Sequence, residues 1–138
     1  MVRITQFKEG DIVRVMDAGV EKIGLVTDIT REDRMVCIDN GVQEFWYAPE
    51  DIIPVPLTED QLIHTLGFER EETADGTKYK KGPFRVVVHD PGNYSNLEVW
   101  YREDRRHFNH PLYVHELQNH HLDMTKVPLE ARITPKTS

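Results

Sequence analysis

The sequence predicts an α+β protein in which a small β-barrel precedes a helix, a four-stranded antiparallel meander and a C-terminal helix. Three observations predict this fold. Short stretches of alternating apolar and polar residues fill the first 55 positions, a helix start signal follows at Thr58, and further alternating stretches precede a segment of helical spacing. The 138 residues suffice for one ordinary domain or two very small ones. We therefore expect a barrel at 1–57, a second domain at 58–130 and a loose tail at 131–138.

Five short strands are expected in the N-terminal part. Asn40-Gly41 is a strong hairpin signal between two of them, and Ala48-Pro49-Glu50-Asp51 has the composition of a tight turn before the last. The expected strands span 11–16, 24–30, 35–38, 44–47 and 52–55. Five short strands with one tight turn before the fifth resemble an SH3-like barrel. Such barrels bind peptides or nucleic acids or are purely structural, so the resemblance assigns no function.

The second part begins with a well-marked helix. Thr58-Glu59-Asp60-Gln61 forms a capping-box sequence, an apolar stripe follows it, and Gly67 ends it. A second helix is expected from His110-Pro111 to about Thr125. Four strands are expected between the helices, at 68–73, 77–81, 84–90 and 97–103. Because a sheet of this size cannot bury a core by itself, we expect the helices to cover one of its faces.

The segment Y-V-H-E-L-Q-N-H-H-L at 113–122 raises the question of a helical zinc site. Such a site needs H-E-x-x-H, because residues four apart lie on one helix face. The position four residues after His115 is Asn119, and His120 and His121 point well away from His115 around the helix. The spacing does not suit one tetrahedral ion. No metal site and no cofactor motif is predicted.

Composition limits the classes of partner. The net charge of −7 and the pI of about 5.4 disfavour binding of duplex nucleic acid and of anionic membranes, so an anion site has to be local. The single cysteine, Cys37, allows no internal disulfide and lies in an alternating stretch, so we expect it in the core. No stretch approaches the roughly 18 apolar residues of a membrane span. We expect an intracellular protein.

Three segments carry a resemblance to a known family: IPVPLTEDQLIHTLGFER, YKKGPFRVVV and YVHELQNHHLDMTKVPLE. They resemble small proteins common in phages and prophages of gut Bacteroidota, which have a PLT-E-x-L-x-x-x-GF helix and a YVHQLQN helix. The resemblance covers roughly residues 52–130. Glu116 stands where the family usually has Gln, and His120 and His121 replace aromatic or aliphatic residues. The family has no established activity, so the resemblance implies a viral origin and the host cell cytoplasm but no catalytic residue.

A basic, aromatic-bearing face is expected on the meander. Alternation places Arg85 and His89 on one face of the third strand and Trp100 and Arg102 on one face of the fourth. Arg105, Arg106 and His107 follow just beyond. Between Thr77 and His107 there are seven Lys or Arg against four acids, a local charge of +3. Arginine binds phosphate bidentately and an aromatic ring stacks on a base, which favours a phosphate-bearing planar ligand. The pattern is also compatible with packing of Trp100 and a solvated charged loop at 102–106.

The C-terminal helix offers a further binding pair. His115 and Asn119 are expected on the side away from the apolar arc, where both can present donors to a ligand or a neighbouring subunit. His120 and His121 lie at or inside the borders of that arc, and we expect them to be packing residues.

Three functions from different classes follow from these observations. The first is a non-catalytic phage protein that sequesters a nucleotide-like immune signal, as an anti-defence protein and in a homo-oligomer. The second is a protein–protein module acting through Phe45, Trp46 and Tyr47. The third is a nucleotide-cleaving enzyme using His89, Asp90 and His107. The ligand-binding residues expected for the first are Arg85, His89, Trp100, Arg102, Arg105, Arg106, His115 and Asn119.

Overall fold

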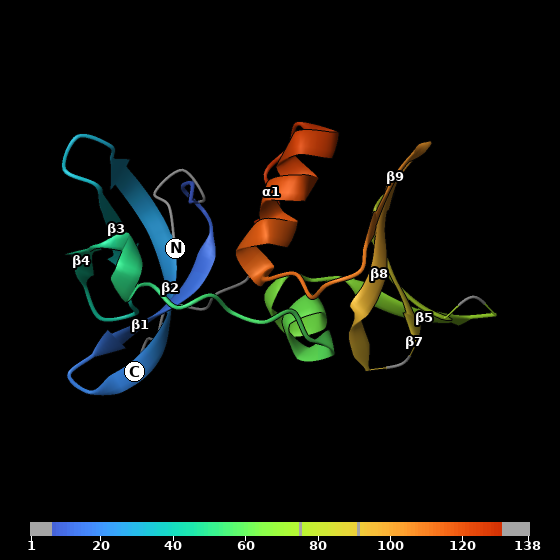
Figure 1. The fold of residues 1–138 in the computed structure, drawn as a ribbon, viewed down its shortest axis with the longest axis horizontal. Coiled ribbons are helices and arrows are strands. Elements are labelled where there is room, and N and C mark those ends of the chain that lie inside the picture. Colours follow the sequence, from blue (N-terminus) through green and yellow to red (C-terminus); the bar gives the residue numbers. More distant parts are fainter. Residues whose placement is uncertain (1–6, 75, 91, 131–138) are drawn as a thin grey trace. The chain divides into compact units, whose positions relative to one another are not determined.

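The computed structural model describes residues 7–74, 76–90 and 92–130. The chain divides into two compact units, one ending at Val55 and the next beginning at Pro56 (Figure 1). This division lies close to the boundary expected after residue 57, and the expected tail at 131–138 lies outside the described residues. Within the described ranges, no helix has both the length and the apolar composition needed to span a bilayer.

The first unit is a four-stranded antiparallel sheet in the order of the sequence. Its strands are β1 (Ile12–Asp17), β2 (Val20–Thr30), β3 (Met35–Asp39) and β4 (Glu44–Tyr47), followed by the 3-10 turn η2 (Pro49–Asp51). The expected five-stranded closed barrel is wrong, because the described strands form an open sheet. Where the fifth strand was expected, Ile53 pairs with Arg14 as an isolated bridge. Pro54, which has no N–H to donate, follows Ile53 and favours this early end of the pairing.

One face of this sheet carries the core of the unit. Gly24 lets the backbone of β2 lie close to this core, because a Cβ at this position would lie only 2.4 Å from Cγ2 of Ile38. Cys37 is 7% exposed within β3, which confirms its expected place in a strand of the core. The buried cluster consists of Phe7, Val13, Val15, Val26, Val36, Ile38 and Ile52.

The second unit is a five-stranded antiparallel meander with one α-helix. Its elements are β5 (Glu69–Thr73), β6 (Gly76–Lys81), β7 (Phe84–Asp90), β8 (Asn93–Tyr101), β9 (Asp104–Phe108) and α1 (Val114–Thr125). The expectation of four strands is therefore wrong by one. The segment at 102–106, which resembles a charged loop in sequence, forms a two-residue turn and most of β9. Together the two sheets make the chain mostly β.

The first expected helix is short. The Thr58 hydroxyl accepts the Gln61 N–H at 3.2 Å, as the capping sequence predicts. The regular part, η3 (Gln61–Thr65), is a single π-helical turn, and Gly67 with φ of 78° ends the segment.

The helix α1 lies against one face of the five-stranded sheet (Figure 1). The His121 ring centroid is 4.5 Å from that of Phe84, and His120 is 4.8 Å from Phe108. Both histidines therefore pack, as expected. The apolar residues of the covered face are buried: Phe84, Val86, Val88, Leu97 and Val99.

Candidate ligand-binding face

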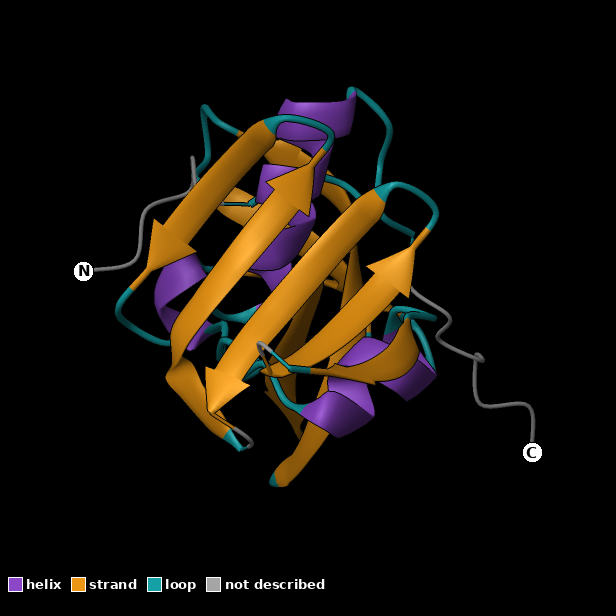
Figure 2. Cartoon of the chain, turned by 90° about the vertical axis from the view of Figure 1, so that its right-hand side faces the viewer, coloured by secondary structure: helices purple, strands orange, loops and turns teal. Residues whose placement is uncertain are grey.

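A single row of side chains crosses the second sheet on the face away from α1. Register places Lys80 opposite Arg85, Arg85 opposite Trp100, and Trp100 opposite Arg105. We call Lys80, Arg85, Trp100 and Arg105 the cationic row. Figure 2 shows this open face toward the viewer, with α1 behind the strands. Because neighbouring strands are about 4.8 Å apart, the row extends over about 15 Å.

Trp100 is the centre of the row. The Arg105 guanidinium carbon is 4.0 Å from the Trp100 ring centroid, and the Lys78 ammonium is 4.9 Å from it. Lys78 lies on β6 and Trp100 on β8, so their contact passes over Val87 of the intervening β7. This explains why Val87 is 0% exposed on a face without a covering helix.

A second polar group borders the indole. Glu98 accepts hydrogen bonds from Trp100 Nε1 at 3.1 Å and from His89 Nε2 at 2.5 Å. Burial by itself raises the pKa of the Glu98 carboxyl, but the bonds from Trp100 and His89 outweigh it and hold the pKa below its ordinary value. His107, opposite Glu98, contacts Asn96 Oδ1 at 2.7 Å. The carboxylate thus fixes the orientation of the ring that the cations contact.

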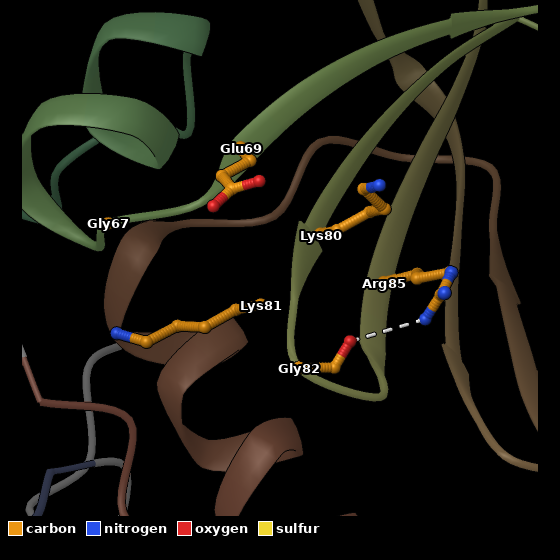
Figure 3. A pocket seen from close by; sticks show the side chains of 6 residues that line it. All are labelled: Gly67, Glu69, Lys80, Lys81, Gly82 and Arg85. Carbon is orange, nitrogen blue, oxygen red and sulfur yellow. Dashed lines mark hydrogen bonds between the residues drawn. The ribbon is translucent and has the colours of Figure 1, made fainter.

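The row ends in a pocket at the β6–β7 turn, with a volume of about 420 Å³ (Figure 3). Arg85 Nη1 donates to the Gly82 carbonyl at 3.3 Å, which turns the guanidinium toward the β6–β7 turn. Lys81 extends away from Lys80 and Arg85, and its ammonium donates to the Leu66 carbonyl at 2.8 Å. The lining residues are Gly67, Glu69, Lys80, Lys81, Gly82 and Arg85.

Four of the expected ligand-binding residues lie on the open face. Arg85, Trp100 and Arg105 are cross-strand neighbours, and His89 lies beside them through Glu98. The structure thus brings together the aromatic ring and two of the expected arginines.

The other four expected residues lie elsewhere. Arg102 occupies the β8–β9 turn with φ of 57°, where its guanidinium is 5.1 Å from the Tyr101 ring. Arg106 alternates to the face of α1, where it donates to His120 Nδ1 at 3.0 Å and to Asp123 at 2.7 Å. His115 is only 4% exposed, so its expected place on the open side of the helix is wrong.

Asn119 is partly buried on α1, which lies on the opposite side of the sheet from the cationic row. The expected pairing of His115 and Asn119 with the basic strand face is therefore not formed in the described structure. The apolar arc of α1 is wider than residue types suggest, because Gln118, which is 0% exposed, donates to the Leu129 carbonyl at 3.0 Å.

The residues expected to bind a ligand did not include Lys78, Lys80 or Glu98, although alternation in the fourth strand places Glu98 on the same face as Trp100. The alternation in K-Y-K-K already places Lys78 and Lys80 on one side of β6. The contact of Lys78 with Trp100 and the position of Lys80 opposite Arg85 depend on the strand register, which the residue pattern did not supply.

Neither a metal site nor a similarity to a known protein adds to the assignment of a function. Among the residues that the structure describes, no group of three or more His, Cys, Asp or Glu side chains is arranged to hold a metal ion. No family model, curated protein or solved structure matches the chain.

Proposed function

We propose that the chain is a non-catalytic binding protein whose cationic row takes a nucleotide-like ligand. The observation that carries the proposal is the Trp100 ring held by Glu98 with cations from two strands beside it. Within the described ranges, neither Arg85 nor Arg105 forms an ion pair with a carboxylate, so both retain their charge for a ligand. Guanidinium groups bind phosphate and the indole stacks on a base.

The local charge supports this proposal against the background of an acidic chain. The molecule carries a net charge of −7, which repels extended polyanions such as duplex nucleic acid. The row by contrast carries three cations within about 15 Å. Such an arrangement favours a small anion with a planar ring.

The resemblance to phage proteins supplies the biological setting of the proposal. A phage protein that binds a nucleotide-like signal removes it from a bacterial immune pathway by mass action, without chemistry. It would act in the host cytoplasm, and a homo-oligomer would deepen an open sheet face into an enclosed site.

The test is to incubate the purified protein with a mixture of bacterial nucleotide signals, remove unbound material, denature the protein and identify what is released. Intact nucleotide released by wild type and lost with Trp100→Ala supports sequestration. New products instead would support the cleaving enzyme, for which His89, Asp90 and His107 are the expected residues. Release of nothing would contradict both.

Trp100→Ala needs a folding control, because the ring also covers Val87. We expect a loss of about 1–2 kcal/mol of unfolding free energy, since part of an apolar cover is removed. A fully buried tryptophan would cost about 3–5 kcal/mol. Thermal or urea unfolding separates the two roles.

A second candidate function is a protein–protein module in the first unit. Phe45 is 42% exposed and Trp46 45%, and aromatic residues of this kind are enriched in interfaces. The open sheet would then bind a host or phage protein through Phe45 and Trp46, because Tyr47 is partly buried against the core cluster of the unit. Crosslinking that depends on Trp46 and not on Trp100 would favour this candidate.

A further inference from the structure

We infer that the pocket at the β6–β7 turn is an anion subsite, which receives the phosphate of a ligand whose ring lies on Trp100. This inference rests on the proposed function and specifies its ligand class: a ring with a separate, extended anionic group, as in a nucleoside 5′-phosphate. A nucleoside has no such group, so it would contact Trp100 but leave the pocket at the β6–β7 turn empty.

The pocket has the chemistry of an anion site. Its lining contains three cations and one acid, Glu69, in a volume of about 420 Å³. Arg85 donates one N–H to the Gly82 carbonyl, which leaves its other guanidinium N–H groups as donors for an anion. Gly82 adopts φ of 59°, which a side chain would disfavour, and no atom lies within 4 Å of where its Cβ would be. The turn therefore leaves the pocket mouth open.

Arg85 and Lys80, the two pocket cations that lie in the cationic row, differ in whether a carboxylate already pairs with them. Arg85 has no acidic partner among the described residues, whereas Lys80 lies 3.5 Å from the Glu71 carboxylate. The Glu71 side chain is 48% exposed, so its carboxylate can rotate toward the solvent when a phosphate takes its place beside Lys80. We expect Arg85 to contribute more than Lys80 to anion binding. Lys81 is bonded to the Leu66 carbonyl and stabilises the pocket wall.

The spacing fits a ring and a phosphate in one molecule. Arg85 is one strand from Trp100 and Lys80 is two strands away, so the two cations lie about 5 Å and about 10 Å from the ring position. A sugar between a base and a 5′-phosphate bridges such a gap. Both groups can therefore be bound at once along the same row, without a change of register.

The experiment compares three probes, adenosine 5′-monophosphate, adenosine and inorganic pyrophosphate, by calorimetry on the full chain. The variants are Arg85→Ala, Lys80→Ala and Trp100→Ala, and the control is Arg31→Ala, an exposed arginine of the first unit. We expect Arg85→Ala to weaken the binding of the monophosphate and of pyrophosphate at least 10-fold. Lys80→Ala should weaken the binding of both by a smaller factor. The affinity for adenosine should fall only in Trp100→Ala. Arg31→Ala should leave the affinity for all three probes unchanged.

The outcomes separate the subsite from the proposed function. Monophosphate binding that is unchanged by Arg85→Ala and Lys80→Ala overturns the subsite, as does the absence of monophosphate and pyrophosphate binding to the wild type. In either case, adenosine binding that is lost with Trp100→Ala leaves the proposed function standing. If Trp100→Ala also leaves adenosine binding unchanged, both the anion subsite and the proposed function are contradicted. Equal weakening by Arg31→Ala would mean unspecific charge attraction and would likewise overturn the subsite.

Discussion

Arg105 lies with its guanidinium carbon 4.0 Å from the centroid of the Trp100 ring, from the directly opposed position on the neighbouring strand. Because strand pairing sets this contact, the cation and the ring are positioned together before any ligand arrives. The indole N–H is in turn bonded to Glu98. The ring therefore has a defined orientation on an otherwise open face, which lowers the entropic cost of stacking a second ring on it.

Arg105 and Arg106 are adjacent in sequence and lie on opposite faces, so they form a matched pair of substitutions. We expect Arg106→Ala to cost about 1–2 kcal/mol of unfolding free energy, because it removes the bonds to His120 and Asp123 that hold α1. Arg105→Ala should change stability by no more than about 0.5 kcal/mol but weaken ligand binding. Urea unfolding measures the first effect. Equal loss of stability in both variants would contradict the assignment of faces.

His120 makes the second unit sensitive to mild acid. Burial, and then the charge of Arg106, lower the pKa of His120 below its ordinary value, so the folded chain holds this ring neutral. The unfolded chain takes up the proton first, and stability is lost as the pH falls from about 6.5 through the lower folded value. His120→Phe should reduce this loss, since an aromatic ring can still pack on Phe108.

The control for this pH effect is His64→Asn, because the His64 side chain is 74% exposed. Unfolding midpoints at pH 7.5 and 5.5, followed by Trp100 fluorescence in a Trp46→Phe background, give the comparison. The idea fails if His64→Asn reduces the acid sensitivity as much as His120→Phe does.

Asp11 gives the first unit the opposite pH dependence. Burial raises the pKa of Asp11 to about 6, against the bonds from Lys8 that lower it. Its contribution to stability is complete below the unfolded pKa, near 4, and is lost as the pH rises through about 6. We expect a slope of up to about 1.4 kcal/mol per pH unit in that window, which Asp11→Asn should remove. The measurement is urea unfolding followed by Trp46 in a Trp100→Phe background.

The matched control for Asp11 is Glu50→Gln, an exposed acid of the same unit. It should keep the slope of the wild type. A slope that survives in Asp11→Asn would mean that other carboxyl groups produce it.

Cys37 tests the register of the first sheet. The residue is 7% exposed, its thiol lies beside the Glu44 carboxylate, and its cross-strand neighbour is Trp46. We expect slow labelling by thiol reagents in the native protein and faster labelling in Trp46→Ala, which removes part of the cover. Phe45→Ala, on the other face of β4, should leave the rate unchanged. Acceleration by Phe45→Ala alone would indicate that the register is shifted by one residue.

Much of the strand pattern could be predicted from alternation and turn signals. The expected span 84–90 coincides with β7, and the apolar sets of β7 and β8 are buried as alternation requires. β8 begins four residues before the expected span, because N-Y-S-N lacks apolar alternation, and its first residue, Asn93, pairs with Asp90 beyond a shift in the register. β9 was missed because its charged residues have low strand propensity, and pairing to β8 outweighs that preference.

The site could be predicted only in part for a related reason. Alternation along one strand assigns faces within that strand, and this was enough for Arg85 and Trp100. It assigned no face to Arg105 or Arg106, because both lie beyond the expected fourth strand, and the turn at Arg102-Glu103 restarts the alternation in β9. Lys80 and Lys78 needed the register of β6 against β7, which depends on the whole sheet.

The most direct measurement of the central claim follows the two indole N–H signals in a nitrogen-correlated NMR spectrum during titration with adenosine 5′-monophosphate. Trp46→Phe assigns the signals, since the chain has two tryptophans. If the cationic row binds the ligand, the Trp100 signal moves with saturation and the Trp46 signal stays in place. A Trp100 signal that does not move at saturating nucleotide, or a shift confined to Trp46, would contradict the claim.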